Sequence, residues 1–299
     1  MTPRFLACSL TIIVASLAHS CTTPKLPSET NDSLVKITDT SHPATLTVMA
    51  NKATSGLADY QHGGKSFKAQ WLSCERTGGK GIVVLNHRDE AGFDDKKFCS
   101  GWIAQAILQG GFDVVAVNRP GFAGSTGRSD FAGPRSIAAI EAGVKAAIAA
   151  NPRTVVGVMG YSSGAIAAAF YARKVPGIAW MMLGGGIYDL EAVAKETQSE
   201  YIRKEVAAIK KAEGDLAWEN RSIAYDVSGL PKRIVLYHGK NDTAVPSAQA
   251  QSFRDSLASS EYHVNLDVID GVAHSIEWAH HRQIIQVLMK SLEIAPPHK

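Results

Sequence analysis

The chain has 299 residues and a net charge of +3, and 45% of its residues are hydrophobic while 20% are charged. This balance is typical of a globular protein. Because the basic residues form no cluster, we expect no nucleic acid as a partner. Beyond the N-terminal stretch, no segment is both long and apolar enough to span a membrane.

The N-terminal residues are expected to lie outside the folded domain. Arg4 precedes a mostly apolar stretch, 5–18, which is too short to span a membrane and suits the core of a signal peptide. Several Pro, Ser and Thr residues follow, as in a polar tether. The expected divisions are a signal peptide at 1–20, a tether at 21–42 and a folded domain at 43–299.

The end of the apolar stretch, Leu17-Ala18-His19-Ser20-Cys21, resembles a bacterial lipoprotein signal, in which the cysteine becomes the lipidated first residue. This resemblance implies an exported protein of the cell envelope that is attached to a membrane through lipid on Cys21. Because Ala18 and His19 depart from the usual pattern, ordinary cleavage and a periplasmic location are the alternative.

Apolar runs alternate with helical patterns along the rest of the chain. This alternation predicts an α/β fold with a mostly parallel sheet of about eight strands and helices on both faces. Strands are expected at 44–49, 66–72, 81–86, 112–117, 154–159, 177–183, 233–237 and 264–269, with helices at 101–109 and 134–150.

A charged helical insertion is expected at about 187–230, between two of these strands. A short cap at this place would select substrates and exclude water from a site beneath it. The alternative is a surface excursion with a solvated charged face.

The most informative motif is Gly160-Tyr161-Ser162-Ser163-Gly164, which lies between an apolar strand and a small-residue helix. A G-x-S-x-G sequence in this context predicts a nucleophile elbow, a tight turn that exposes the serine hydroxyl. Ser162 is therefore the candidate nucleophile, and a helix-start serine without catalytic function is the alternative.

An activated serine needs a base and an acid that orients the base, and in this motif's fold both follow the serine in the chain. Asp242 lies on the loop after the strand at 233–237, so it is the candidate acid. A turn-capping role is the alternative for Asp242, and Asp270 is the second candidate acid.

His274 lies on the loop after the last strand and is the candidate base. His280 and His281 compete with it, although they fall on an expected C-terminal helix where a histidine is usually solvated or stacked. His238 ends a strand and is expected to pack under the acid loop.

Four segments together resemble the α/β-hydrolase superfamily: 118–125 (NRPGFAGS), the elbow, 238–246 (HGKNDTAVP) and 271–275 (GVAHS). The second half is similar to the branch that contains prolyl-oligopeptidase-type peptidases and dienelactone-hydrolase-type esterases. The resemblance covers about 65–295. It implies an α/β-hydrolase fold with Ser162 as nucleophile, Asp242 as acid and His274 as base.

An oxyanion hole needs two backbone N–H groups aimed at the developing charge. Ser163, the residue after the nucleophile, is one candidate. Arg88, after the strand at 81–86, is the other by position, although many relatives carry His-Gly where this chain has His87-Arg88. A merely solvated charged loop is the alternative there.

Cys74 and Cys99 remain in the expected mature domain. An oxidising compartment favours a disulfide. Strand geometry argues against it, because we expect the two residues at opposite edges of the sheet, about 17–20 Å apart, whereas bridged Cα atoms lie within about 7 Å. No cysteine or histidine spacing indicates a metal site.

The expected function is a serine hydrolase of the carboxylesterase type, acting on a small-molecule ester without a cofactor or metal. A peptidase acting on short peptides and an acyltransferase would use the same triad. A non-catalytic binding lipoprotein on this scaffold is the fourth alternative. We expect no large propeller domain of the kind that oligopeptidase relatives carry, because the chain is too short for one.

Overall fold

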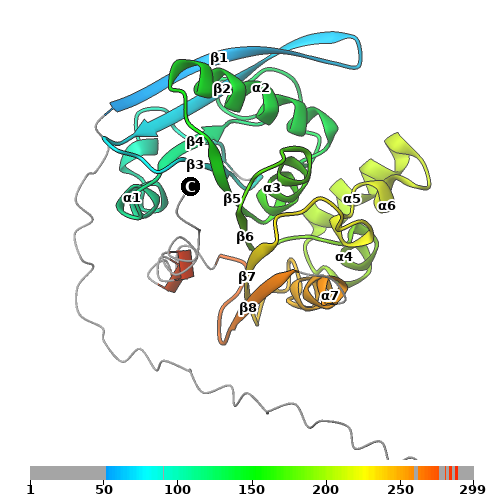
Figure 1. Ribbon diagram of the computed structural model, residues 1–299. Coiled ribbons are helices and arrows are strands. Elements are labelled where there is room, and N and C mark those ends of the chain that lie inside the picture. The colour runs from blue at the N-terminus through cyan, green and yellow to red at the C-terminus, as the bar shows by residue number, and fades with distance from the viewer. Residues whose placement is uncertain are drawn as a thin grey trace, which may run out of the picture. The chain divides into compact units, whose positions relative to one another are not determined.

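The computed structural model describes residues 52–89, 91–258, 262–275, 280, 283–284 and 287–288. Eight strands form one sheet in the order β1-β2-β4-β3-β5-β6-β7-β8 (Figure 1). The strands are β1 (Lys52–His62), β2 (Lys65–Glu75), β3 (Ile82–Asn86), β4 (Asp113–Val117), β5 (Val155–Tyr161), β6 (Trp180–Gly184), β7 (Arg233–Gly239) and β8 (His263–Ile269).

Among the strands of this sheet, only β2 runs antiparallel to the rest. β1 pairs antiparallel with β2, and β2 pairs antiparallel with β4, whereas every pair from β4 to β8 is parallel. The central strands β3 to β6 are buried along their whole length, as expected for parallel strands that are covered on both faces. The mostly parallel α/β sheet predicted by the alternation of strands and helices is confirmed.

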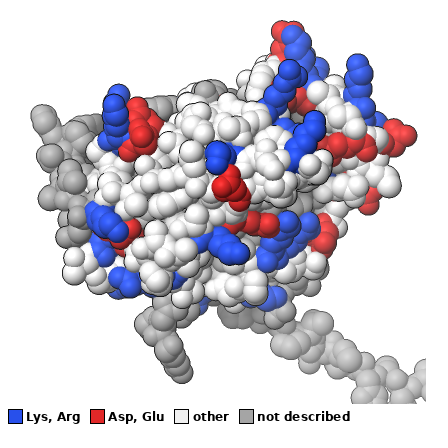
Figure 2. All heavy atoms as spheres, turned by 90° about the horizontal axis from the view of Figure 1, so that it is seen from above, with Lys and Arg blue, Asp and Glu red and all other residues white. Residues whose placement is uncertain are grey.

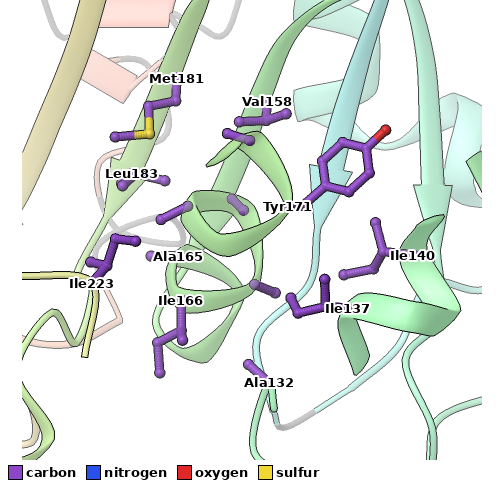
Figure 3. Close-up of a cluster of buried hydrophobic side chains, with 14 of the residues drawn as sticks. Ala132, Ile137, Ile140, Val158, Ala165, Ile166, Tyr171, Met181, Leu183 and Ile223 are labelled. Atoms are coloured by element: carbon purple, nitrogen blue, oxygen red, sulfur yellow. The ribbon is translucent and has the colours of Figure 1, made fainter. Parts of the chain in front are cut away.

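Helices cover both faces of this sheet. Buried residues of α1 share one apolar cluster with Ile284 and Leu288, while α2, α3 and α7 contribute to the cluster on the other face. Figure 3 shows α3 packed between Ile137 and Ile140 of α2 and Leu183 of β6. The bounds of these helices are α1 (Trp102–Gln109), α2 (Pro134–Ala150), α3 (Ser163–Lys174) and α7 (Ala248–Leu257).

The opening hairpin differs from the expectation. The strand expected at 44–49 lies outside the described residues, and the strand that pairs with β2 is β1 instead. Gly63 and Gly64 connect the two strands with φ of 55° and 72°, as in a two-residue hairpin turn. β1 alternates only weakly between polar and apolar residues because it is an edge strand with an exposed side, so its sequence pattern is faint.

Cys74 and Cys99 form a disulfide, with their Cα atoms 5.5 Å apart, and the expectation from strand geometry is wrong. The chain passes through a 3-10 helix, η1 (Phe98–Ser100), before α1 begins, and η1 packs against β2. Cys99 therefore lies beside Ser73 and Cys74, with its Sγ 3.6 Å from the Ser73 carbonyl oxygen, rather than at the opposite edge of the sheet.

The segment between β6 and β7 is helical, as its sequence predicts. It contains α4 (Leu190–Glu196), α5 (Glu200–Glu213), α6 (Ala217–Asn220) and the 3-10 helix η2 (Ile223–Tyr225). α5 buries Ile202, Val206 and Ile209, which recur on one side of the helix, and leaves most of its charged residues exposed. This segment, hereafter the insertion, is thus anchored to the main core by apolar contacts.

Charges of both signs lie interspersed on the face drawn in Figure 2. Over the part of the chain that the structure describes, no helix combines the length and apolar character needed to cross a bilayer.

Candidate active site

The turn between β5 and α3 has the geometry of a strained elbow. Ser162 adopts φ 55° and ψ −124°, a conformation rare for a residue with a side chain, and α3 begins at the next residue. A Cβ on Gly160 would lie 2.0 Å from the carbonyl oxygen of Gly164. A Cβ on Gly164 would lie 2.5 Å from the carbonyl oxygen of His87, so both positions require glycine.

Three side chains from distant parts of the sequence meet at this elbow. His274 Nε2 lies 3.0 Å from Ser162 Oγ, and His274 Nδ1 lies 2.7 Å from Asp242 Oδ2. The three residues follow β5, β7 and β8, which run parallel, so their loops leave the same edge of the sheet. The structure thus brings all three candidate residues into one hydrogen-bonded chain.

Asp242 is held as a carboxylate. Its Oδ1 accepts hydrogen bonds from the backbone N–H groups of Ala244 (3.0 Å) and Val245 (2.8 Å). Burial alone raises the pKa of the Asp242 carboxyl, but hydrogen bonds from His238, His274 and the Val245 N–H, together with the charge of His274, outweigh burial and lower this pKa from 3.8 to about 2. Asp242 is therefore ionised at neutral pH and suited to stabilise an imidazolium.

His238 lies beneath the acid loop, as expected, and is fully buried. Its Nε2 lies 2.7 Å from the Val245 carbonyl oxygen, which can only accept, so Nε2 carries the proton. The same Nε2 lies 3.4 Å from Asp242 Oδ2. His238 is thus a second imidazole that faces the acid.

The competing acid candidate, Asp270, has a different partner. Asp270 is exposed and pairs with Lys240 at 2.7 Å. The carbonyl oxygen of His280 accepts a hydrogen bond from the Ile284 N–H, and His281 lies outside the described residues. The Tyr161 hydroxyl donates to the carbonyl oxygen of His274, which fixes the loop that carries this imidazole.

The two candidate oxyanion donors flank the elbow. Ser163 is the first residue of α3, so its N–H has no acceptor within the helix. Asn86 and His87 lie against Gly164 at the helix start, and Arg88 follows them directly in the chain. A backbone N–H from each side of the elbow is the arrangement that stabilises a tetrahedral intermediate.

A buried polar cluster behind these donors was not foreseen from the sequence. Arg119 is 1% exposed, and its Nη2 lies 3.0 Å from both Ser163 Oγ and Asp89 Oδ1. The Arg119 backbone N–H also donates to His87 Nε2 at 3.0 Å. Burial and then the charge of Arg119 hold the pKa of His87 well below its usual value, so this imidazole is neutral.

Arg119 belongs to the segment 118–125 on which the superfamily resemblance rests, but no spacing rule connects it to Ser163. The described residues include no group of three or more His, Cys, Asp or Glu side chains placed to hold a metal ion.

Several solved structures share this fold. Acylaminoacyl peptidase of Pyrococcus horikoshii superposes with a TM-score of 0.65 at 15% identity, over 83% of this chain and 42% of that one. A puromycin-hydrolyzing peptidase of Mycobacterium tuberculosis gives 0.61 at 18% identity, over 84% and 39%. An esterase of Pyrococcus furiosus gives 0.59 at 18% identity, over 81% and 91%.

The chain thus spans less than half the length of both peptidases. No curated protein sequence was found to match it. A sequence model of the prolyl oligopeptidase family matches residues 101–291, which include the elbow, the acid loop and the histidine loop. The chain belongs to the prolyl oligopeptidase family, and its fold is that of the α/β-hydrolases.

Proposed function

We propose that this serine hydrolase cleaves carboxylic esters of small molecules through an acyl-enzyme intermediate. The observation that carries the proposal is the hydrogen-bonded chain from Ser162 Oγ through His274 to Asp242, with distances of 3.0 and 2.7 Å. A serine is a weak nucleophile unless a base accepts its proton, and here the base is already in place.

In the first half-reaction Ser162 Oγ attacks the acyl carbon while His274 Nε2 takes the hydroxyl proton. The amides of Ser163 and Arg88 bind the oxyanion. The tetrahedral intermediate then collapses, and the imidazolium protonates the departing alcohol. Asp242 holds the Nδ1–H of His274 throughout and so fixes the tautomer that leaves Nε2 free to accept.

In the second half-reaction a water molecule takes the place of the alcohol. His274 removes a proton from the water as it attacks the acyl-serine, and then returns the proton to Ser162 Oγ as the acid product leaves. The reaction as proposed uses only groups of this chain and water.

Two observations help to distinguish ester substrates from peptide substrates. The Pyrococcus furiosus esterase is matched over 91% of its length, whereas the acylaminoacyl peptidase is matched over 42%. This difference supports the ester reaction. Membership of the prolyl oligopeptidase family supports the second candidate, hydrolysis of short peptides by the same residues.

The test is labelling with a fluorophosphonate probe, followed by mapping of the adduct by mass spectrometry. We expect an adduct on Ser162 in the wild type and none in Ser162→Ala, while Ser228→Ala, a change of an exposed serine, labels normally. A folded wild type that stays unlabelled would contradict the assignment. p-Nitrophenyl esters and N-acyl-peptide p-nitroanilides, assayed side by side, then decide between the two substrate classes.

We further propose that the protein is exported and anchored through lipid on Cys21, with residues 1–20 removed and 21–42 as a tether. The Cys74–Cys99 disulfide supports export, because disulfides persist in oxidising compartments. Mass spectrometry of the N-terminal peptide provides the test. An acylated Cys21 is expected. A mature N-terminus without lipid would instead support ordinary cleavage of the signal peptide.

A further inference from the structure

The Arg119 guanidinium touches both segments that carry the oxyanion donors. Its Nη2 lies 3.0 Å from Ser163 Oγ on α3 and 2.7 Å from the carbonyl oxygen of His87, the residue before Arg88. A single nitrogen atom therefore contacts both the first turn of α3 and the loop after β3.

Arg119 is an unexpected residue for a purely structural role. It is 1% exposed, and its Nε and Nη1 find no hydrogen-bond partner among the described residues. A buried cation needs compensation, and well-packed apolar residues often stabilise a core as well as an ion pair does. Its counter-ion is Asp89, whose side chain is 6% exposed and whose Oδ1 lies 3.0 Å away.

The other oxygen of Asp89 reaches the insertion. The hydroxyl of Tyr201, on α5, donates to Asp89 Oδ2 at 3.0 Å. The Tyr201 ring is 50% exposed and lies edge-on to Phe131, with ring centroids 6.3 Å apart. The ring thus keeps a packing contact of its own, and the hydroxyl is the group that links α5 to the loop after β3.

We propose that Tyr201, Asp89 and Arg119 are positioning residues that couple the insertion to the oxyanion hole. The proposal rests on the function proposed above. Both Asp89 oxygens are used, one toward the insertion and one toward Arg119, so a displacement of α5 changes the position of Arg119 and of the two amides. Oxyanion donors act through fixed orientation, so their effect is lost when this alignment is lost.

Tyr201→Phe isolates the link, because the ring stays on Phe131 and only the hydroxyl is removed. Loss of an oxyanion donor lowers kcat by about 10²–10³-fold. We expect loss of a group that only positions donors to have a smaller effect, about ten-fold in kcat, with KM nearly unchanged. Arg119→Lys keeps the charge but loses the planar guanidinium that reaches several acceptors at once. Because Arg119 contacts both donor-carrying segments directly, we expect a larger loss than for Tyr201→Phe, up to about 10²-fold.

The experiment compares a p-nitrophenyl ester with the corresponding thionoester. A developing C–S⁻ accepts hydrogen bonds poorly, so the oxyanion hole contributes little to thionoester cleavage. A damaged hole slows the oxoester selectively, whereas partial unfolding slows both substrates equally. Each rate is divided by the concentration of active serine, which is measured by titration with a fluorophosphonate. Tyr225→Phe is the matched control, since Tyr225 is 52% exposed, lies in the insertion and has its hydroxyl at Glu191.

We expect Tyr201→Phe and Arg119→Lys to lower the oxoester-to-thionoester rate ratio, while Tyr225→Phe keeps the wild-type ratio. The coupling is overturned if the wild type cleaves the ester and Tyr201→Phe behaves like Tyr225→Phe, or if Tyr201→Phe slows both substrates equally. A wild type that leaves both substrates intact overturns the proposed function itself, and the coupling with it.

Discussion

Two imidazoles face one carboxylate oxygen: Nε2 of His238 lies 3.4 Å from Asp242 Oδ2, and Nδ1 of His274 lies 2.7 Å from the same atom. His274 is 20% exposed at its side chain, whereas His238 is fully buried. The buried imidazole of His238 contacts the acid, whereas the partly exposed imidazole of His274 also contacts Ser162.

The first prediction concerns His238 and acid stability. The pKa of Asp242 is lowered to about 2 in the folded protein, so its carboxylate stabilises the fold above pH 4 and this contribution is lost as the pH falls toward 2. A shift of this size corresponds to roughly 2 kcal/mol. His238→Phe removes one donor and raises the pKa of Asp242. Denaturant titrations should show a variant that is less stable at pH 7.

The same titrations at pH 5 and pH 3 provide the sharper readout. Because the pKa of Asp242 in His238→Phe lies closer to its unfolded value, this variant should lose less stability over that interval than the wild type. His238→Gln, which retains a donor, should restore the wild-type dependence. Identical pH dependence in the wild type and His238→Phe would show that His238 does not act on Asp242.

The second prediction separates the two candidate acids. Asp242→Asn removes the charge that fixes the His274 tautomer, so kcat for esters should fall by about 10⁴-fold with the fold intact. Asp270→Asn breaks only an exposed pair with Lys240, which is separate from the hydrogen-bonded chain of Ser162, His274 and Asp242, so we expect activity within about two-fold of the wild type. Steady-state ester hydrolysis measures both variants, and the reverse ranking would move the acid role to Asp270.

The third prediction concerns the elbow. A Cβ on Gly164 would lie 2.5 Å from His87 O and 2.6 Å from Asn86 O, both backbone atoms that cannot rotate away. Gly164→Ala should therefore unfold the protein or displace α3 and abolish fluorophosphonate labelling. Gly177→Ala is the control, because that Cβ meets nothing within 4 Å. It should cost about 1–2 kcal/mol through its positive φ alone, with labelling retained.

The fourth prediction concerns the disulfide. Cys74 and Cys99 are 25 residues apart. Closing a loop of that length lowers the entropy of the unfolded chain, which stabilises the folded protein by about 3 kcal/mol. Reduction should lower the melting temperature by on the order of 5–10 °C. Thermal unfolding with and without reductant measures this effect. In the Cys74→Ala/Cys99→Ala double variant the reductant should change nothing; a shift there would mean that the effect does not come from this bond.

Much of the fold follows from the sequence because the central strands are short apolar runs bounded by Gly and Pro. The strand expected at 154–159 is β5 (Val155–Tyr161), and the helix expected at 134–150 is α2 with the same bounds. The edge strand β1 was missed because an exposed edge needs no apolar run. The Gly63-Gly64 turn was the signal that could have located it.

The meeting of Ser162, Asp242 and His274 could be anticipated, because parallel strands deliver their following loops to one edge. The coupling of Tyr201 to Asp89 could not, since it depends on how a helix of the insertion folds back over a loop 112 residues earlier in the chain. The disulfide was missed for a related reason: it depends on the contact of η1 with β2, which no local sequence pattern predicts.

The Cys74–Cys99 bond also makes a covalent ring of the chain that contains β3 and the whole loop with His87, Arg88 and Asp89. Asp94, Asp95 and Lys96 form an exposed turn inside this ring. A protease that cuts this turn leaves two fragments that remain joined. The nicked protein therefore runs as one band on a non-reducing gel and as two after reduction, and cleavage there opens the loop without releasing either half of the site.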